Sequence, residues 1–198
     1  MPNSKRHPFF DNAILLFTFV FLFWGVEFAD RMITHVDFEI HGVIPREQRG
    51  LPGIIFAPFL HGDLNHLVGN TLPFLILGGM VLLSGFQAFA IVTILSALVA
   101  GVGIWLFAAS NTVHIGASTL VFGYLGFLLL RAWFSRDWRW AAIAIVAVFL
   151  YGGLVMTLFR HVPGVSWHGH AFGFLGGAFA ARWMSGDGEP KKSRPATA

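Results

Sequence analysis

The chain has 198 residues, of which 56% are hydrophobic and only 12% are charged. Because a soluble domain carries roughly twice that share of charge, the composition excludes a water-soluble globule and predicts a polytopic α-helical membrane protein. The net charge of +3 and the absence of cysteine argue against a nucleic-acid-binding surface, disulfides and thiolate metal sites. A membrane β-barrel would show short alternating segments in place of long apolar blocks.

The apolar blocks follow one another closely along the chain. After a polar, basic segment of residues 1–11, the first block covers about residues 12–28. It has no small-x-small cleavage site, so we expect a transmembrane helix and not a signal peptide. Further blocks cover about residues 66–83, 86–109, 113–133, 138–159 and 167–184, and each can cross the hydrocarbon core. We therefore predict a membrane domain of six transmembrane helices over residues 12–184 and a disordered cytoplasmic tail over residues 185–198.

Residues 29–65 form the longest stretch that does not resemble a membrane span, because charged residues and prolines interrupt its short apolar pieces. A connection this long is seldom structureless, so we expect a long outer loop that packs on the membrane surface or dips into it. Glu27, near the outer end of the first block, lies four residues before Arg31 and is expected to form a structural ion pair with it.

The distribution of positive charge predicts the orientation. An even number of spans places both termini on the same side of the membrane. That side would hold nine Lys and Arg residues, and the other side would hold four. The nine are Lys5, Arg6, Arg131, Arg136, Arg139, Arg182, Lys191, Lys192 and Arg194, and the four are Arg31, Arg46, Arg49 and Arg160. The positive-inside rule therefore predicts that both termini are cytoplasmic.

Three blocks that run inward from the outer face begin with unusual polar residues. These are His66 and Asn70 in block 66–83, Ser118 in block 113–133, and His170 in block 167–184. Polar groups at membrane depth cost free energy unless they are paired or face a wet cavity, so three such groups at matching depth indicate a shared site.

The residue types in these three blocks suit nucleophilic catalysis. A serine becomes a nucleophile when a base accepts its proton, and histidine has the pKa for that task. His66 and Asn70 share one helix face and can donate hydrogen bonds to an oxyanion. Since no carboxylate lies in a block where it could orient His170, the prediction is a Ser–His dyad. The competing interpretation is that Ser118 bonds to its own backbone or aids helix packing.

Small residues would bring the serine and the histidine together. Gly123 and Gly126 in one block, and Gly173 and Gly177 in another, allow close approach of two helices, and Gly173-x-x-x-Gly177 has the spacing of such packing sites. Glycines of this kind also occur as generic packing residues in other helix bundles.

The ordered set of these motifs resembles the rhomboid family of intramembrane serine proteases. The set comprises His61-x4-His66-x3-Asn70, Gly116-x-Ser118 and His170-x2-Gly173-x3-Gly177, and the loop residues Gly42–Arg46, Gly50–Ile54 and Pro58–His61 also resemble bacterial rhomboids. The resemblance covers roughly residues 12–184. It implies a six-helix bundle in a bacterial inner membrane that cleaves single-span membrane proteins near the outer face.

The resemblance also implies a role for each matching residue. Ser118 would be the nucleophile and His170 its general base, whereas His66, Asn70 and the Ser118 backbone N–H would form the oxyanion hole. His61 would brace the outer loop. No cofactor or metal is implied, and the partners would be transmembrane substrates and the lipid bilayer.

The chain departs from the family pattern at two positions. Thr119 stands where a glycine usually follows the serine, and a β-branched residue restricts the backbone there. Phe122 stands where many members have a tyrosine that packs on the catalytic histidine. His168 competes with His170 for the role of base, but the spacing to Gly173 favours His170, and we expect His114 to lie at the outer interface without a catalytic role.

Other functions remain open at this point. The first alternative is a catalytically weak or inactive rhomboid-like protein that binds membrane clients. A metal or haem protein using His61, His66, His168 and His170 would lack carboxylate and thiolate ligands and would leave Ser118 and Asn70 unexplained. A transporter would be expected to show an inverted repeat and broken helices, and neither is found.

Overall fold

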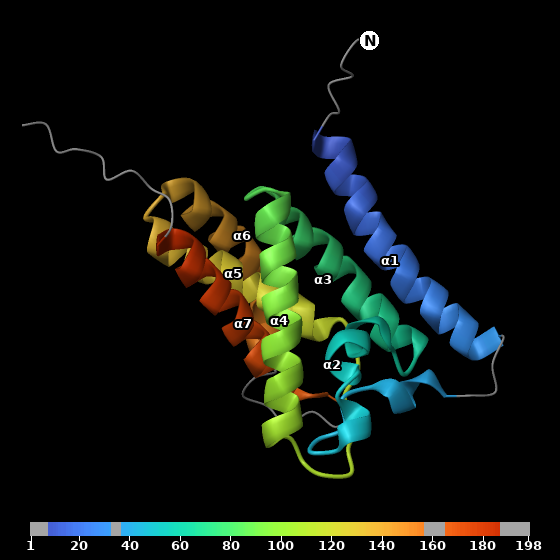
Figure 1. Ribbon diagram of the computed structural model, residues 1–198. Coiled ribbons are helices and arrows are strands. Elements are labelled where there is room, and N and C mark those ends of the chain that lie inside the picture. The colour runs from blue at the N-terminus through green and yellow to red at the C-terminus, as the bar shows by residue number, and fades with distance from the viewer. Residues whose placement is uncertain (1–7, 33–36, 157–164, 187–198) are drawn as a thin grey trace, which may run out of the picture.

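The computed structural model describes residues 8–32, 37–156 and 165–186 (Figure 1). Within these ranges the chain is helical, with no strand beyond an isolated bridge between Val43 and His114, so the predicted all-α class is confirmed. The long helices are α1 (Pro8–Met32), α3 (Leu64–Leu82), α4 (Phe86–Phe107), α5 (Ser118–Ser135), α6 (Trp138–Val155) and α7 (Trp167–Gly186). A single helical turn, α2 (Gly53–Phe56), lies between α1 and α3.

Five of these helices, α1 and α3 to α6, are long and apolar enough to cross a bilayer. Helix α7 has 20 residues but is not among the five, because histidines stand in its first turn and Arg182 near its end. Large apolar side chains such as Phe21 and Phe149 are exposed on the outside of the bundle. Exposure of this kind fits lipid and not water, so the protein is an integral membrane protein.

The helices alternate in direction, as Figure 1 shows. Helices α3, α5 and α7 all begin at the lower end of the view and run upward, whereas α4 runs downward in front of them. The polar residues at the starts of α3, α5 and α7 therefore lie toward one end of the bundle. Helix α1 stands at the side and packs mainly on α3.

Helix α5 is the centre of the bundle. Every residue from Thr119 to Leu128 is buried, and α5 contacts α3, α4, α6 and α7. Tyr124 at its middle is fully buried against Phe74 and Phe89, and its hydroxyl lies 2.9 Å from the Thr93 hydroxyl. By contrast α6 buries only Ala144 and Ala147, so most of its surface faces outward.

Glycines bring α5 and α7 into backbone contact. A Cβ at Gly177 would overlap the Gly123 carbonyl oxygen, and one at Gly173 would overlap the Thr119 carbonyl oxygen. A Cβ at Gly126 would likewise overlap a carbonyl of α7. The contacts thus extend from the first turn of α5 to its middle, which requires glycine at each of these positions.

The segment between α1 and α3 is built of short turns packed against α4. Besides α2 it contains the 3₁₀ turns η1 (Phe38–His41), η2 (Gln48–Gly50) and η3 (Ala57–Phe59). The Arg46 guanidinium donates to the carbonyls of Leu106 and Ala108, at 3.0 and 2.7 Å, and so caps the C-terminus of α4. Trp105 Nε1 donates to the Glu47 carbonyl at 3.0 Å.

The helix predicted over 113–133 begins five residues later than expected, at Ser118. His114 instead pairs with Val43 in an extended bridge, and Gly116 has a φ of 110°. That dihedral lies outside the right-handed helical region and suits glycine, so the helix cannot extend back through it. The sequence pattern misplaced this boundary because the residues before Ser118 are as apolar as the helix itself.

We predict that Gly177→Ala lowers the free energy of unfolding by about 1–3 kcal/mol, because the added methyl overlaps the α5 backbone. Thermal unfolding in detergent micelles, followed by tryptophan fluorescence, measures the change. Gly25→Ala is the matched control, since nothing lies within 4 Å of a Cβ at that helical position. Equal midpoints for both variants would contradict close packing of α5 on α7.

Candidate active site at the N-termini of three helices

Residues 113–117, which we call the pre-α5 segment, are fixed by backbone hydrogen bonds to the segment between α1 and α3, which we predicted to be the outer loop. His114 and Val43 exchange two N–H···O bonds of 3.0 Å, and Gly116 N donates to the Ala57 carbonyl at 2.8 Å. Ala117 N donates to Nε2 of His61 at 3.4 Å. The position of Ser118, the first residue of α5, is therefore set by contacts with the loop as well as by its own helix.

Gly116 brings this segment against α3. A Cβ at Gly116 would lie 2.6 Å from the Nε2 of His66 and 3.5 Å from the Nδ2 of Asn70. The missing side chain therefore lets the backbone two residues before Ser118 lie directly on both of these polar groups. The structure thus brings together His66, Asn70 and the start of α5, which belong to separate parts of the sequence.

The start of α3 holds two potential hydrogen-bond donors in place. The carboxylate of Asp63 accepts a 2.8 Å hydrogen bond from the His66 backbone N–H and so caps the helix. Asn70 lies one turn further on the same face and is buried, and its Nδ2 has no hydrogen-bond partner among the described residues. A buried amide N–H without a partner is costly, so an acceptor placed beside it would be bound favourably.

His61 is a buried histidine of the outer loop, with 2% of its surface exposed. Its ring packs edge-on against His66, with a centroid separation of 5.1 Å. Burial first, and then the neighbouring His66 imidazole, lower the pKa of His61 to about 4, so the ring is neutral at neutral pH. A neutral ring can accept from Ala117 N–H, which makes His61 a brace for the pre-α5 segment.

His170 lies on the first turns of α7 and is buried against α5. Its imidazole stacks on the Phe122 ring with centroids 4.0 Å apart and an interplanar angle of 13°. Ser118 is four residues before Phe122 and therefore lies one turn nearer the start of α5, on the same face of the helix. The stack thus holds the imidazole on the face of α5 that carries the serine, and Ser118 itself is half-buried.

The N-terminus of α5 has no capping side chain. Its N-cap is Ala117, whereas α3 and α6 are capped by Asp63 and Asp137. Alanine at this position leaves the first N–H groups of the helix without the usual acceptor, which typically costs about 1 kcal/mol. These N–H groups, including that of Ser118, are suited to stabilise an anion that forms beside the serine.

Thr119 does not distort this helix. It has helical geometry, and its backbone faces Gly173 of α7. A Cβ at Gly169 would lie 3.1 Å from the Thr119 Cγ2 methyl, so the absence of a side chain on α7 leaves room for the β-branched residue. The methyl group of Thr119 therefore packs between α5 and α7.

Two other histidines lie close to this region. The His168 ring packs on the Trp167 ring, with centroids 3.9 Å apart. His114 is half-buried and accepts or donates through both ring nitrogens, to Thr112 and Ser166. Ser166 and Asp63 both cap helices of the site, and a capping-type polar residue within three positions before an apolar block was the signal that could have identified them.

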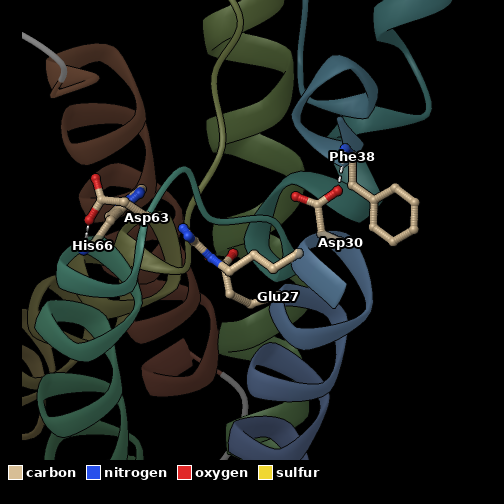
Figure 2. A network of polar contacts seen from close by, with 6 residues as sticks. Glu27, Asp30, Phe38, Asp63 and His66 are labelled. Atoms are coloured by element: carbon tan, nitrogen blue, oxygen red, sulfur yellow. Dashed lines mark hydrogen bonds and ion pairs between the residues drawn. The ribbon is translucent and has the colours of Figure 1, made fainter. Parts of the chain in front are cut away.

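A polar cluster at the C-terminal end of α1 borders the site (Figure 2). Glu27 is 3% exposed and accepts from the Nε of Arg31 at 2.6 Å, which confirms the predicted pairing. Asp30 accepts from the Phe38 backbone N–H at 2.8 Å, and Asp63 with His66 lies nearby at the start of α3. Among the described residues, no three His, Asp or Glu side chains are grouped to hold a metal ion.

Comparison with known proteins assigns the chain to a family. A family profile described as Rhomboid domain matches residues 48–186. Uncharacterized proteins of Mycobacterium tuberculosis and Mycobacterium bovis are each 36% identical to the chain over 191 residues, which cover 92% of this chain and 79% of each relative. An uncharacterized protein of Mycobacterium leprae is 35% identical over 191 residues, covering 92% of this chain and 75% of that relative. The chain therefore belongs to the rhomboid family, whose members are typically intramembrane serine proteases.

Proposed function

We propose that this protein is an intramembrane serine endopeptidase that hydrolyses a peptide bond in or near the transmembrane segment of single-span membrane proteins. The observation that supports this most is the stack of His170 on Phe122, one turn from Ser118 at the uncapped start of α5. His66 and Asn70 lie against the backbone just before the serine. Nucleophile, base and hydrogen-bond donors therefore converge from three helices.

In the first step, the Ser118 hydroxyl attacks the carbonyl carbon of the substrate peptide while the His170 imidazole accepts its proton. The stack on Phe122 restrains the imidazole ring of His170 during this transfer. The protonated imidazole then donates that proton to the leaving amine, and an acyl-enzyme on Ser118 remains. Water, activated by the same histidine, releases the carboxylate product.

The tetrahedral intermediate of each step carries a negative oxygen. Three donors are available for it, namely Asn70 Nδ2, the ring of His66 and the backbone N–H of Ser118. The Asn70 amide is buried and without a partner among the described residues, so it can donate without first breaking another bond. Preorganised donors of this kind act strongly because they need not reorient during the reaction.

The proposed setting is a bacterial inner membrane with α7 as a sixth span and both termini in the cytoplasm. The excess of Lys and Arg on that side supports this orientation. The starts of α3, α5 and α7 then lie toward the outer face. The resemblance to the family also implies a cap loop over about residues 160–167 that moves to admit the substrate, and most of it lies outside the described residues.

The competing function is that of a non-catalytic rhomboid-like protein that binds membrane clients. Thr119 was the sequence feature in its favour, but the Thr119 methyl packs toward Gly169 between the helices. Labelling with a serine-reactive fluorophosphonate, followed by mapping of the modified residue, separates the two functions. Modification of Ser118 supports the protease, and an unlabelled, folded protein supports the client-binding alternative.

We predict that Ser118→Ala and His170→Ala each reduce cleavage of a reporter protein with one transmembrane helix to background, a loss of at least about 10³-fold. The measurement is cleavage of the reporter in proteoliposomes. Each variant should still insert and fold, although His170→Ala should lower the unfolding temperature more than Ser118→Ala because it removes a buried ring from the stack on Phe122. Full activity in either folded variant contradicts the assignment of the dyad.

We predict that Asn70→Ala lowers the turnover number by about 10²-fold, less than Ser118→Ala, because the other oxyanion donors remain. The matched control is Asn65→Ala, which removes the same amide from an exposed position on the first turn of α3. Steady-state cleavage rates of the two variants make the comparison. Equal rates for both variants would show that Asn70 does not stabilise the intermediate.

A further inference from the structure

A chain of hydrogen bonds joins the pre-α5 segment to the start of α7. The Thr112 hydroxyl lies 2.6 Å from the Ala109 carbonyl oxygen and 2.8 Å from His114 Nε2. His114 Nδ1 lies 2.6 Å from the Ser166 hydroxyl, and Ser166 Oγ accepts from Gly169 N–H at 3.2 Å. Neither Ser166 nor Thr112 has a part in the proposed chemistry.

The direction of each hydrogen bond follows from the available protons. The Thr112 hydroxyl proton goes to the Ala109 carbonyl, so Thr112 accepts from His114 Nε2–H. Burial, and secondarily the neighbouring His168, lower the pKa of His114 to about 4, so the ring is neutral and its Nδ1 is an acceptor. Ser166 therefore donates to Nδ1, while its oxygen accepts from Gly169. One assignment of the protons therefore gives a hydrogen-bond partner to both ring nitrogens of His114 and to the Ser166 hydroxyl.

These hydrogen bonds connect α5 and α7 at positions that are equally far in sequence from the two residues of the proposed dyad. His114 is four residues before Ser118, and Ser166 is four residues before His170. His114 is also fixed to Val43 by two backbone bonds, so its ring is anchored on the outer loop. Ser166 is the N-cap of α7, so moving its hydroxyl moves the first turn of that helix.

The contact complements the glycine packing between the same helices. Gly173 and Gly177 hold α7 against α5 one and two turns beyond His170, toward the C-terminus of α7. The His114–Ser166 bond is a polar, directional contact on the other side of His170, toward the helix starts. Close packing limits the separation of two helices, but a directional bond also limits rotation and sliding. Together the two contacts fix the imidazole from both sides.

We propose that His114 and Ser166 are positioning residues of the protease, whose hydrogen bond sets the first turn of α7 so that the His170 ring meets Ser118. This inference rests on the function proposed above. Neither residue touches the reacting atoms in this scheme, and both act through the helix start that carries the base. A displacement of about 1 Å at a reacting group can cost about 10²-fold in rate, which gives such a contact a measurable effect.

The test separates positioning from simple helix capping. His114→Phe removes the acceptor but leaves Ser166 free to cap α7. Ser166→Gly removes the hydroxyl at little cost to the helix start, since glycine is a tolerated N-cap. Ser166→Thr keeps both hydrogen bonds. His41→Phe, at an exposed histidine of η1, is the matched control. The readouts are the rate of Ser118 labelling by a fluorophosphonate, kcat and KM for the reporter protein, and the unfolding midpoint.

We expect His114→Phe and Ser166→Gly each to slow labelling and kcat by about 10- to 100-fold, with KM changed less than about twofold. The double variant should be no slower than either single variant, because both remove the same contact. Ser166→Thr should recover the rate to within about threefold, and His41→Phe should match the wild type. A wild-type labelling rate in folded His114→Phe, or additive losses in the double variant, would overturn the proposal.

A measurement independent of activity tests the contact itself. In ¹⁵N-histidine NMR spectra, the signal of His114 is identified as the one that His114→Phe removes. In the wild type this signal should have the chemical shifts of a neutral ring protonated at Nε2. Ser166→Gly should shift its Nδ1 resonance. An Nδ1-protonated or charged ring at neutral pH refutes the arrangement even if the enzyme is active. If the wild type shows the expected ring but Ser118 is never labelled, the proposed protease function fails, and the positioning role fails with it.

Discussion

The structure depends above all on the absence of side chains where α5 meets α7. Gly173 and Gly177 place the α7 backbone directly on the carbonyls of Thr119 and Gly123. In a bilayer, lipid tails are as apolar as the helices, so close packing and not hydrophobic burial holds such a pair together. This contact brings His170 onto the face of α5 that carries Phe122 and Ser118. A methyl group at either glycine would force the helices apart and separate the proposed base from the nucleophile.

The segment between α1 and α3 supplies contacts that the long helices alone do not provide. Its backbone pairs with the pre-α5 segment, and Arg46 ties it to the end of α4. Gly116 can then adopt its positive φ and place the chain on His66 and Asn70. The same bonds make α5 begin at Ser118. The first N–H groups of the helix therefore lie at a helix start that has no capping side chain. In this way a loop outside the predicted spans shapes the proposed oxyanion site.

Several polar side chains near the site are satisfied, whereas His61 Nδ1, Thr119 Oγ1 and Asn70 Nδ2 are buried without a partner among the described residues, and of these three only Asn70 is proposed to act on the substrate. Glu27, Asp63, His114 and Ser166 each have partners, and they fix helix ends relative to one another. Asn70 Nδ2 is buried without a partner among the described residues, although such an arrangement is costly. Satisfied groups of this kind give rigidity, and an unsatisfied donor held on that rigid frame is available to a reaction intermediate.

The sequence by itself determined the class, the approximate helix positions and the set of residues that could form a site. Long apolar blocks have few alternatives to membrane helices, and the spacing of Ser118, His66, Asn70 and His170 does not depend on tertiary detail. Only the tertiary structure decided where α5 begins, because the loop pairing with His114 and the φ of Gly116 overrule an apolar sequence that would otherwise continue the helix. It also decided that Thr119 packs toward α7 and that His114 bonds Ser166, since both depend on contacts between residues about 50 positions apart in the chain. Such pairings cannot be predicted from local composition, because they form only when close-packed helices bring distant residues together.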